Sequence, residues 1–252
     1  MYLNRKKWGF KLFLILSGIF ISSLVACNLI FQKFFYWSPF QFLMEDGSLL
    51  GSVLPQGLVS GLGNFTFEIS AGILPYPVTF LVTDIISEIY GRKKANLVVL
   101  SGFIASIFIM LVTTLAQVVP ATTWSPVSNE LFTKVFGLFG PAVFASMTAY
   151  LTAQFIDIRI FHFWKELTKG KHLWLRNNGS TVASQLVDTS AVLLLLCSFE
   201  VIAWDRFSML LFNGFLFKML VAFVDTPLFY LSSWYLKKSF NLKIDENLDD
   251  DF

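Results

Sequence analysis

The sequence predicts an all-α polytopic membrane protein with six transmembrane helices, and two observations support this fold class. Of the 252 residues, 55% are apolar and only 14% are charged, whereas a soluble domain contains about a quarter charged residues. The apolar residues also gather in separate runs of about 20 residues, the length that a helix needs to cross a bilayer. The mean hydropathy of +0.65 agrees. We therefore expect a single integral membrane domain over residues 1–252.

The first span is expected over residues 12–31, directly after a basic N-terminal segment. Residues 24–27 also fit the lipobox of a lipoprotein signal peptide. We expect no cleavage there, because the apolar run continues to Phe31 and a secreted remainder would not tolerate five further spans.

Five further apolar runs predict the remaining spans. They cover residues 73–90, 96–118, 135–158, 179–202 and 209–234. Pro75 and Pro77 remove two backbone donors at the start of the second span, so we expect this helix to be kinked or broken.

The distribution of Lys and Arg orients these spans. The basic segments are the N-terminus, residues 91–94, the loop 159–178 and the C-terminal tail, and the segments poor in Lys and Arg are 40–71, 120–134 and 203–208. By the positive-inside rule, both chain ends lie in the cytoplasm. Residues 40–71 are then an extracytoplasmic loop, and residues 159–178 a cytoplasmic one.

The composition excludes several other classes of site. Cys27 and Cys197 both lie in apolar runs, and His162 and His172 lie in the basic loop, so neither a disulfide framework nor a histidine-based metal or catalytic centre is predicted. The net charge of +2 arises from basic residues beside the spans, which does not indicate nucleic-acid binding. No cofactor is predicted.

Carboxylates inside the apolar runs are the strongest functional signal, because each costs about 2.5–3.5 kcal/mol to insert into a bilayer. The embedded acids are Asp84, Glu88, Asp157, Asp188 and Asp225. At 1.5 Å per helical residue, all of them fall in the cytoplasmic half of the membrane. Such a layer is expected around a central site or along a route to it.

Other polar residues share helix faces with these acids and predict a common polar interior. They are Asn28, Tyr150 with Gln154, Thr181 with Ser184 and Gln185, and Lys218 with Asp225. Structural roles stay open for several of them. Asn28 and Ser184 also suit hydrogen bonding between helices, and Lys218 also suits snorkelling towards the outside.

For two of the acids, an ordinary ion pair with a nearby basic residue is an alternative to a functional role. Glu88 lies four residues before Arg92, and Asp157 lies beside Arg159, so either acid also fits an ordinary pair near the membrane surface. Tyr76, at the predicted bend, suits an interface anchor better than a ligand contact.

Three pieces of the sequence resemble the queuosine-precursor transporter family, also called the vitamin uptake transporter family. They are Ala26-Cys27-Asn28-Leu29-Ile30 with Lys33, then Pro77-Val78-Thr79-Phe80 through Thr83-Asp84 to Glu88-Ile89-Tyr90-Gly91-Arg92-Lys93, and Arg176-Asn177 leading to Ser180-Thr181, Ser184-Gln185 and Asp188-Thr189. The resemblance implies a membrane transporter for 7-deazaguanine bases, such as 7-cyano- and 7-aminomethyl-7-deazaguanine, or queuine, that serve tRNA modification.

For such a ligand, the hypothesis is that Glu88 or Asp84 accepts the paired N–H donors of the guanine-like edge, and that Asp188 with Gln185 completes the pocket. Donors for the opposite edge are expected from Asn28, Asn177, Gln185 or Arg176, and stacking from Phe80, Tyr76 or Tyr90. Asp225, with Lys218 on the same helix face, is the candidate for proton or ion coupling.

Three other function classes compete with this hypothesis. An intramembrane enzyme is disfavoured, because no histidine is embedded and the sequence contexts of aspartyl intramembrane proteases are missing. The alternative is the substrate-binding membrane subunit of an ATP-driven vitamin importer, which would need partner chains because this sequence contains no P-loop. A channel or scaffold is the third class.

The expected partners are a purine-like small molecule and the lipid bilayer of the bacterial plasma (inner) membrane. A homodimer is also possible.

Overall fold

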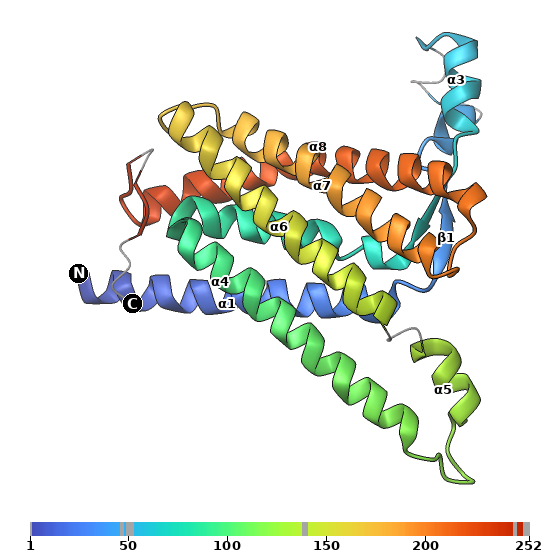
Figure 1. Ribbon diagram of the computed structural model, residues 1–252. Coiled ribbons are helices and arrows are strands. Elements are labelled where there is room, and N and C mark those ends of the chain that lie inside the picture. Colours follow the sequence, from blue (N-terminus) through green and yellow to red (C-terminus); the bar gives the residue numbers. More distant parts are fainter. Residues whose placement is uncertain (1, 46–47, 49–52, 138–140, 244–245, 249–252) are drawn as a thin grey trace.

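The computed structural model describes residues 2–45, 48, 53–137, 141–243 and 246–248, without the side chains of residues 2–6 and 141–146. About 77% of it is helical. The long helices are α1 (Tyr2–Ile30), α4 (Tyr76–Val118), α6 (Pro141–Leu167), α7 (Leu173–Ser198) and α8 (Phe207–Ser239) (Figure 1). The shorter elements are β1 (Phe34–Trp37), α3 (Gln56–Gly63), β2 (Phe67–Ser70), α5 (Asn129–Phe136) and the 3₁₀ turns η1 (Gln41–Met44), η2 (Ala71–Ile73) and η3 (Trp204–Arg206).

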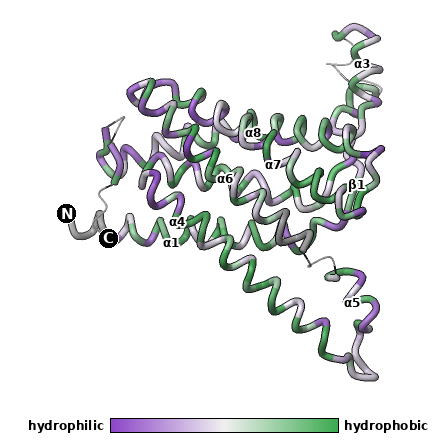
Figure 2. The backbone as a smooth tube through the Cα atoms, viewed as in Figure 1, coloured by the Kyte–Doolittle hydropathy of each residue, from purple (hydrophilic) through white to green (hydrophobic). Residues whose placement is uncertain are grey.

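Four helical stretches of the described residues are long and apolar enough to cross a membrane. They are Lys7–Ile30, Ala71–Val118, Leu173–Ser198 and Trp204–Ser239. Figure 2 shows hydrophobic residues along much of α1, the second half of α4 and α8. The chain is therefore a multi-pass membrane protein. The second and third predicted spans both fall within Ala71–Val118, and the fourth falls largely in α6, so the count of six stays a prediction.

The backbone leaves the helical conformation inside α4 at Gly91, where φ is 80° and ψ is 174°. In Figure 1 the chain reverses here, and the residues after Gly91 run back towards the side where α4 begins. Pro75 caps α4 and Pro77 lies in its first turn, where the missing N–H leaves no helical bond unmade. The kink expected at these prolines is thus not confirmed there.

Helix α7 begins earlier than the sequence analysis placed it. It starts at Leu173 rather than at residue 179, and α6 extends to Leu167, so only residues 168–172 of the expected loop 159–178 connect the two helices. The density of basic residues in this segment predicts a loop that includes Arg176 and Asn177. They are instead helical and buried against neighbouring helices, with 1% and 4% of their surface exposed.

The expected extracytoplasmic loop 40–71 contains regular structure, apart from residues 46–47 and 49–52, which lie outside the described residues. Its β2 pairs antiparallel with β1, so that Phe34 faces Ser70 and Trp37 faces Phe67. The fully buried Phe67 packs against Trp37 and against Phe217 of α8. The described chain is predominantly helical, as the fold class predicts, and the two-stranded sheet corrects the expectation of a loop without regular structure.

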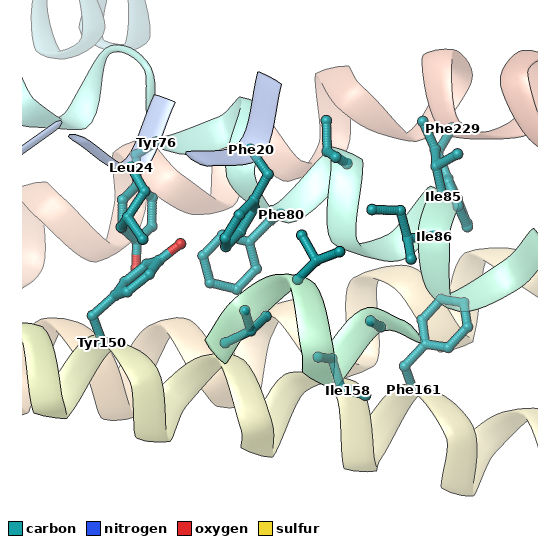
Figure 3. Close-up of a cluster of buried hydrophobic side chains, with 14 of the residues drawn as sticks. Phe20, Leu24, Tyr76, Phe80, Ile85, Ile86, Tyr150, Ile158, Phe161 and Phe229 are labelled. Atoms are coloured by element: carbon teal, nitrogen blue, oxygen red, sulfur yellow. The ribbon is translucent and has the colours of Figure 1, made fainter. Parts of the chain in front are cut away.

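A continuous apolar core joins the helices, and aromatic side chains dominate it. Figure 3 shows Phe20 of α1, Phe80 of α4, Phe161 of α6 and Phe229 of α8 pointing into one layer. Helix α6 packs against α7 and α4, α1 packs against α4, and α7 packs against α8. This arrangement turns polar faces of α4, α6, α7 and α8 towards one another.

Candidate functional site

A cavity of about 190 Å³ lies at the end of the bundle that carries the β-sheet. We call it the outer cavity. Most of its wall is apolar, from Leu24 and Cys27 of α1 to Leu193 of α7 and Leu210 of α8. Its polar lining comprises Asn28, Glu68, Ser70, Tyr76, Tyr150, Asp188, Thr189 and Lys218. An apolar wall with a few converging polar groups is typical of small-molecule sites.

A buried cluster of Tyr76, Asp188 and Lys218 forms part of this wall. The Lys218 Nζ lies 2.8 Å from Asp188 Oδ2 and donates to Thr189 Oγ1 at 3.0 Å. The Tyr76 hydroxyl also donates to Asp188 Oδ2, and the Lys218 Nζ lies 4.1 Å from the centroid of the Tyr76 ring. The Asp188 Oδ1 accepts no hydrogen bond within the described part of the chain, although this oxygen is buried. The cluster is therefore nearly neutral and retains one open acceptor.

A second cavity, of about 20 Å³, lies beside this cluster, and we call it the inner cavity. It is lined by Ile73, Tyr76, Pro77, Phe80, Leu81, Asp84, Asn177, Thr181, Gln185, Lys218, Val221, Ala222 and Asp225. A volume of this size holds little more than one water molecule. Its lining nevertheless combines two carboxylates, two amides and two aromatic rings.

Asp84 lies against Asp157 of α6 at one edge of the inner cavity. Asp84 Oδ1 and Asp157 Oδ2 are both buried and have no hydrogen-bond partner in the described residues. Asp157 Oδ1 accepts from Ser184 Oγ at 2.9 Å. The Oε1 of Gln185 is buried and has no hydrogen-bond partner in the described residues. Hydrogen-bond acceptors of Asp84 and Gln185 are therefore available to a ligand.

Glu88, one turn further along α4, lies in a different environment. Its carboxylate accepts from Arg176 at 2.7 Å and 3.4 Å, lies 3.6 Å from the Lys165 Nζ, and pairs with Lys237. Arg176 also donates to the Gly170 carbonyl and lies over the Phe161 ring. Glu88 thus joins α6, α7 and α8 at the end of the bundle near Gly91.

Residues 70–232 match the family described as "Putative vitamin uptake transporter". The chain belongs to this family. It is also similar to the "Probable queuosine precursor transporter" of Bacillus subtilis (strain 168), with 29% identity over 159 residues, which cover 62% of this chain and 64% of that relative. No solved structure matches the chain.

In this vitamin uptake transporter family member, the structure gathers most of the predicted site residues around the two cavities. Phe80, Asp84, Asn177, Gln185, Lys218 and Asp225 line the inner cavity, and Asn28, Asp188 and Lys218 line the outer one. Arg176 and Glu88 line neither and pair with each other. Asn28 also donates to Ser106 at 3.2 Å, which agrees with its alternative role between helices.

Several local expectations are replaced by long-range contacts. The ion-pair partners of Glu88 come from α6, α7 and α8 rather than from Arg92, and Asp157 faces Ser184 and Asp84 rather than Arg159. Tyr76 is 9% exposed and bonded to Asp188, so it is not the interface anchor expected. Lys218 pairs with Asp188 instead of snorkelling outwards.

Sequence reasoning gave no functional weight to Lys165 and Lys237. Both lie in segments whose positive charge already had an explanation in the topology, and no signal in the sequence separates them from neighbouring lysines.

Proposed function

We propose that this chain takes up a queuosine precursor across the bacterial plasma (inner) membrane for tRNA modification. The substrate is a 7-deazaguanine base, such as 7-cyano- or 7-aminomethyl-7-deazaguanine, or queuine. Support comes from membership of the vitamin uptake transporter family and from the similarity to the probable queuosine precursor transporter of Bacillus subtilis. Six membrane spans, with both chain ends in the cytoplasm, are part of this proposal.

The observation that carries the proposal is the lining of the inner cavity. Asp84, Gln185 and Asn177 come from two different helices, and Phe80 lies on the same side of α4 as Asp84. A carboxylate there accepts the N1–H and the exocyclic amine of a guanine-like edge, while amide groups donate to its carbonyl side. The ring of Phe80 supplies a face for stacking. This set of groups fits a purine-like base better than a sugar or an amino acid.

Asp84 is the better candidate of the two carboxylates proposed to read the base edge. Glu88 is held by three cations of the described residues, and a ligand would have to displace them. Asp225 lines the inner cavity from α8 and is half-buried, which supports the proposal that it binds or relays a proton if uptake is proton-coupled. Lys218 contacts both cavities and is placed to respond to ligand in either of them.

The proposal is tested in a bacterial host that cannot synthesise queuosine. We expect expression of the chain to restore the modified base in tRNA when the correct precursor is supplied. Asp84→Asn should reduce this uptake about tenfold to a hundredfold, because a lost hydrogen bond to a charged group costs about 1.5–3 kcal/mol.

Glu130→Gln, on the exposed helix α5, is the matched control and should leave uptake unchanged. No restoration with any precursor, at confirmed membrane expression, would refute the function. Uptake that survives an uncoupler but stops on ATP depletion would instead indicate the importer subunit.

A further inference from the structure

Three residues, Ile73, Tyr76 and Lys218, line both cavities and therefore form the wall between them. We propose that the outer cavity is a separate binding site that the planar base occupies first, and that the cluster of Tyr76, Asp188 and Lys218 is the partition that must open before the base reaches the inner cavity. This inference rests on the proposed function. It assigns the structure to a state in which the route between the two cavities is closed.

Size is the first argument for a separate outer site. The outer cavity has about 190 Å³, whereas the inner one has about 20 Å³ and cannot hold a bicyclic base in this state. A base arriving from the side of the β-sheet would therefore meet the outer cavity first. Glu68 of β2 lines this cavity and pairs with Arg206 at 3.7 Å, with 26% and 56% of their side-chain surfaces exposed. These exposures place the pair near solvent.

The chemistry of the outer cavity suits the same class of ligand as the inner one. The Tyr76 and Tyr150 rings lie 5.5 Å apart at 66°, and both contribute to the lining, so aromatic surface is available to a flat heterocycle. The Asp188 Oδ1 is a buried acceptor without a partner among the described residues, and the Asn28 side chain offers a donor and an acceptor. A planar base with two adjacent N–H groups therefore finds a carboxylate partner in this cavity too.

Asp188 links ligand binding to the opening of the partition. Its Oδ2 holds both the Tyr76 hydroxyl and the Lys218 Nζ, with only 10% of the Lys218 and 4% of the Asp188 side-chain surface exposed. N–H donors of a bound base would compete with these two partners for the same carboxylate. A ligand shifts a conformational equilibrium only through such a difference in interactions between the two states. The base itself thus supplies the energy that releases Tyr76 and Lys218 from Asp188.

The test uses thiol accessibility in a background where Cys27→Ala and Cys197→Ala remove both native cysteines. Leu193→Cys reports on the outer cavity and Val221→Cys on the inner cavity. Intact cells are treated with a membrane-impermeant methanethiosulfonate. We expect Leu193→Cys to react and Val221→Cys to stay unreactive. Comparable rates at both positions would overturn the partition.

Variants of the partition give the second measurement. Lys218→Met and Tyr76→Phe each remove a bond to Asp188, so each should raise the reaction rate at Val221→Cys several-fold. An unchanged rate at Leu193→Cys in the same variants shows that the fold is retained. If neither variant exposes Val221→Cys, the partition assignment is wrong.

A third measurement, with ligand added during labelling, distinguishes failure of the outer binding site from failure of the proposed function. Added 7-cyano-7-deazaguanine, or whichever precursor restores the tRNA base, should slow the reaction of Leu193→Cys several-fold. Uptake without any such protection would overturn the outer binding site and leave the proposed function standing. Failure of every precursor to restore the tRNA base would overturn the function, whatever the thiol rates show.

Discussion

Glu88 and Asp188 are both buried carboxylates, but their charges are balanced in different ways. Asp188 has one cationic partner among the described residues, Lys218, and lines the outer cavity, and its buried Oδ1 has no hydrogen-bond partner there. Glu88 has three, Arg176, Lys165 and Lys237, and lines neither cavity. A one-to-one ion pair can be opened by a competing ligand. The Glu88 carboxylate instead binds cations from three helices at once, so a ligand would have to displace several partners. We therefore interpret Asp188 as a functional carboxylate and Glu88 as a structural one.

This difference predicts that Glu88→Gln destabilises the protein more than it alters substrate recognition. The substitution leaves buried cations without their anion, which costs about 3–5 kcal/mol when one partner of a buried pair is removed. We expect a lower Tm and a lower yield of the detergent-solubilised protein. Lys237→Met is the matched control and should have a smaller effect, because Glu88 keeps Arg176 and Lys165. A parental Tm for Glu88→Gln would contradict the structural role.

The polar residues that the sequence predicts for the site and that line the inner cavity share one property: they interrupt apolar runs. Asp84 and Gln185 stand out because lipid would reject them, and the structure places both at the inner cavity. Lys165 and Lys237 do not stand out, since they lie among other basic residues at helix ends. Whether such a lysine faces solvent or an interior carboxylate depends on packing between helices, which a single sequence does not display.

At the scale of elements, the reversal at Gly91 determines which part of α4 lies against the two cavities. It turns the first part of α4, which carries Phe80, Asp84 and Glu88, back against the rest of the bundle. The φ of 80° with ψ of 174° belongs to a region that is essentially restricted to glycine. An added Cβ would also lie 3.0 Å from the Asn247 Nδ2 of the C-terminal tail.

Gly91→Ala should therefore cost about 1–3 kcal/mol in backbone strain and lower the Tm of the solubilised protein. Gly18→Ala is the control, because a Cβ at Gly18 meets nothing within 4 Å and alanine favours a helix more than glycine does. We expect that variant to be neutral or slightly stabilising. If the two substitutions had equal effects on Tm, the special conformation of Gly91 would carry no stability.

Helices were predicted more completely than the β-sheet, and the reason is the distance over which each signal acts. A membrane helix is visible in one continuous apolar run. The pairing of Phe34 with Ser70 joins residues on either side of a long segment, and it is fixed by the packing of Phe67 on α8. Neither contact leaves a pattern among neighbouring residues of the sequence, so the sequence alone predicts a loop over residues 40–71.

At the scale of the whole molecule, the described segments nearest the two chain ends lie at one end of the bundle, together with the basic partners of Glu88. The Leu248 N–H donates to the Ile89 carbonyl at 2.7 Å, and the Tyr90 hydroxyl donates to the Gly9 carbonyl at 2.9 Å. Trp8 and Phe240 are in ring contact there, with centroids 4.5 Å apart. The β-sheet lies at the opposite end (Figure 1). This polarity accommodates the predicted topology, with both chain ends on the same side.

The orientation of this bundle follows from the positive-inside rule, and it makes a prediction of its own. In the background without native cysteines, Thr123→Cys lies between α4 and α5, and Lys171→Cys lies in the connection between α6 and α7. Both positions are exposed. An impermeant maleimide added to intact cells should label Thr123→Cys and should label Lys171→Cys only after permeabilisation.

The opposite labelling pattern would mean that the bundle has the inverse orientation, with the outer cavity on the cytoplasmic side. Labelling of both positions in intact cells would mean that α6 does not cross the membrane, and the proposed six spans would then be wrong.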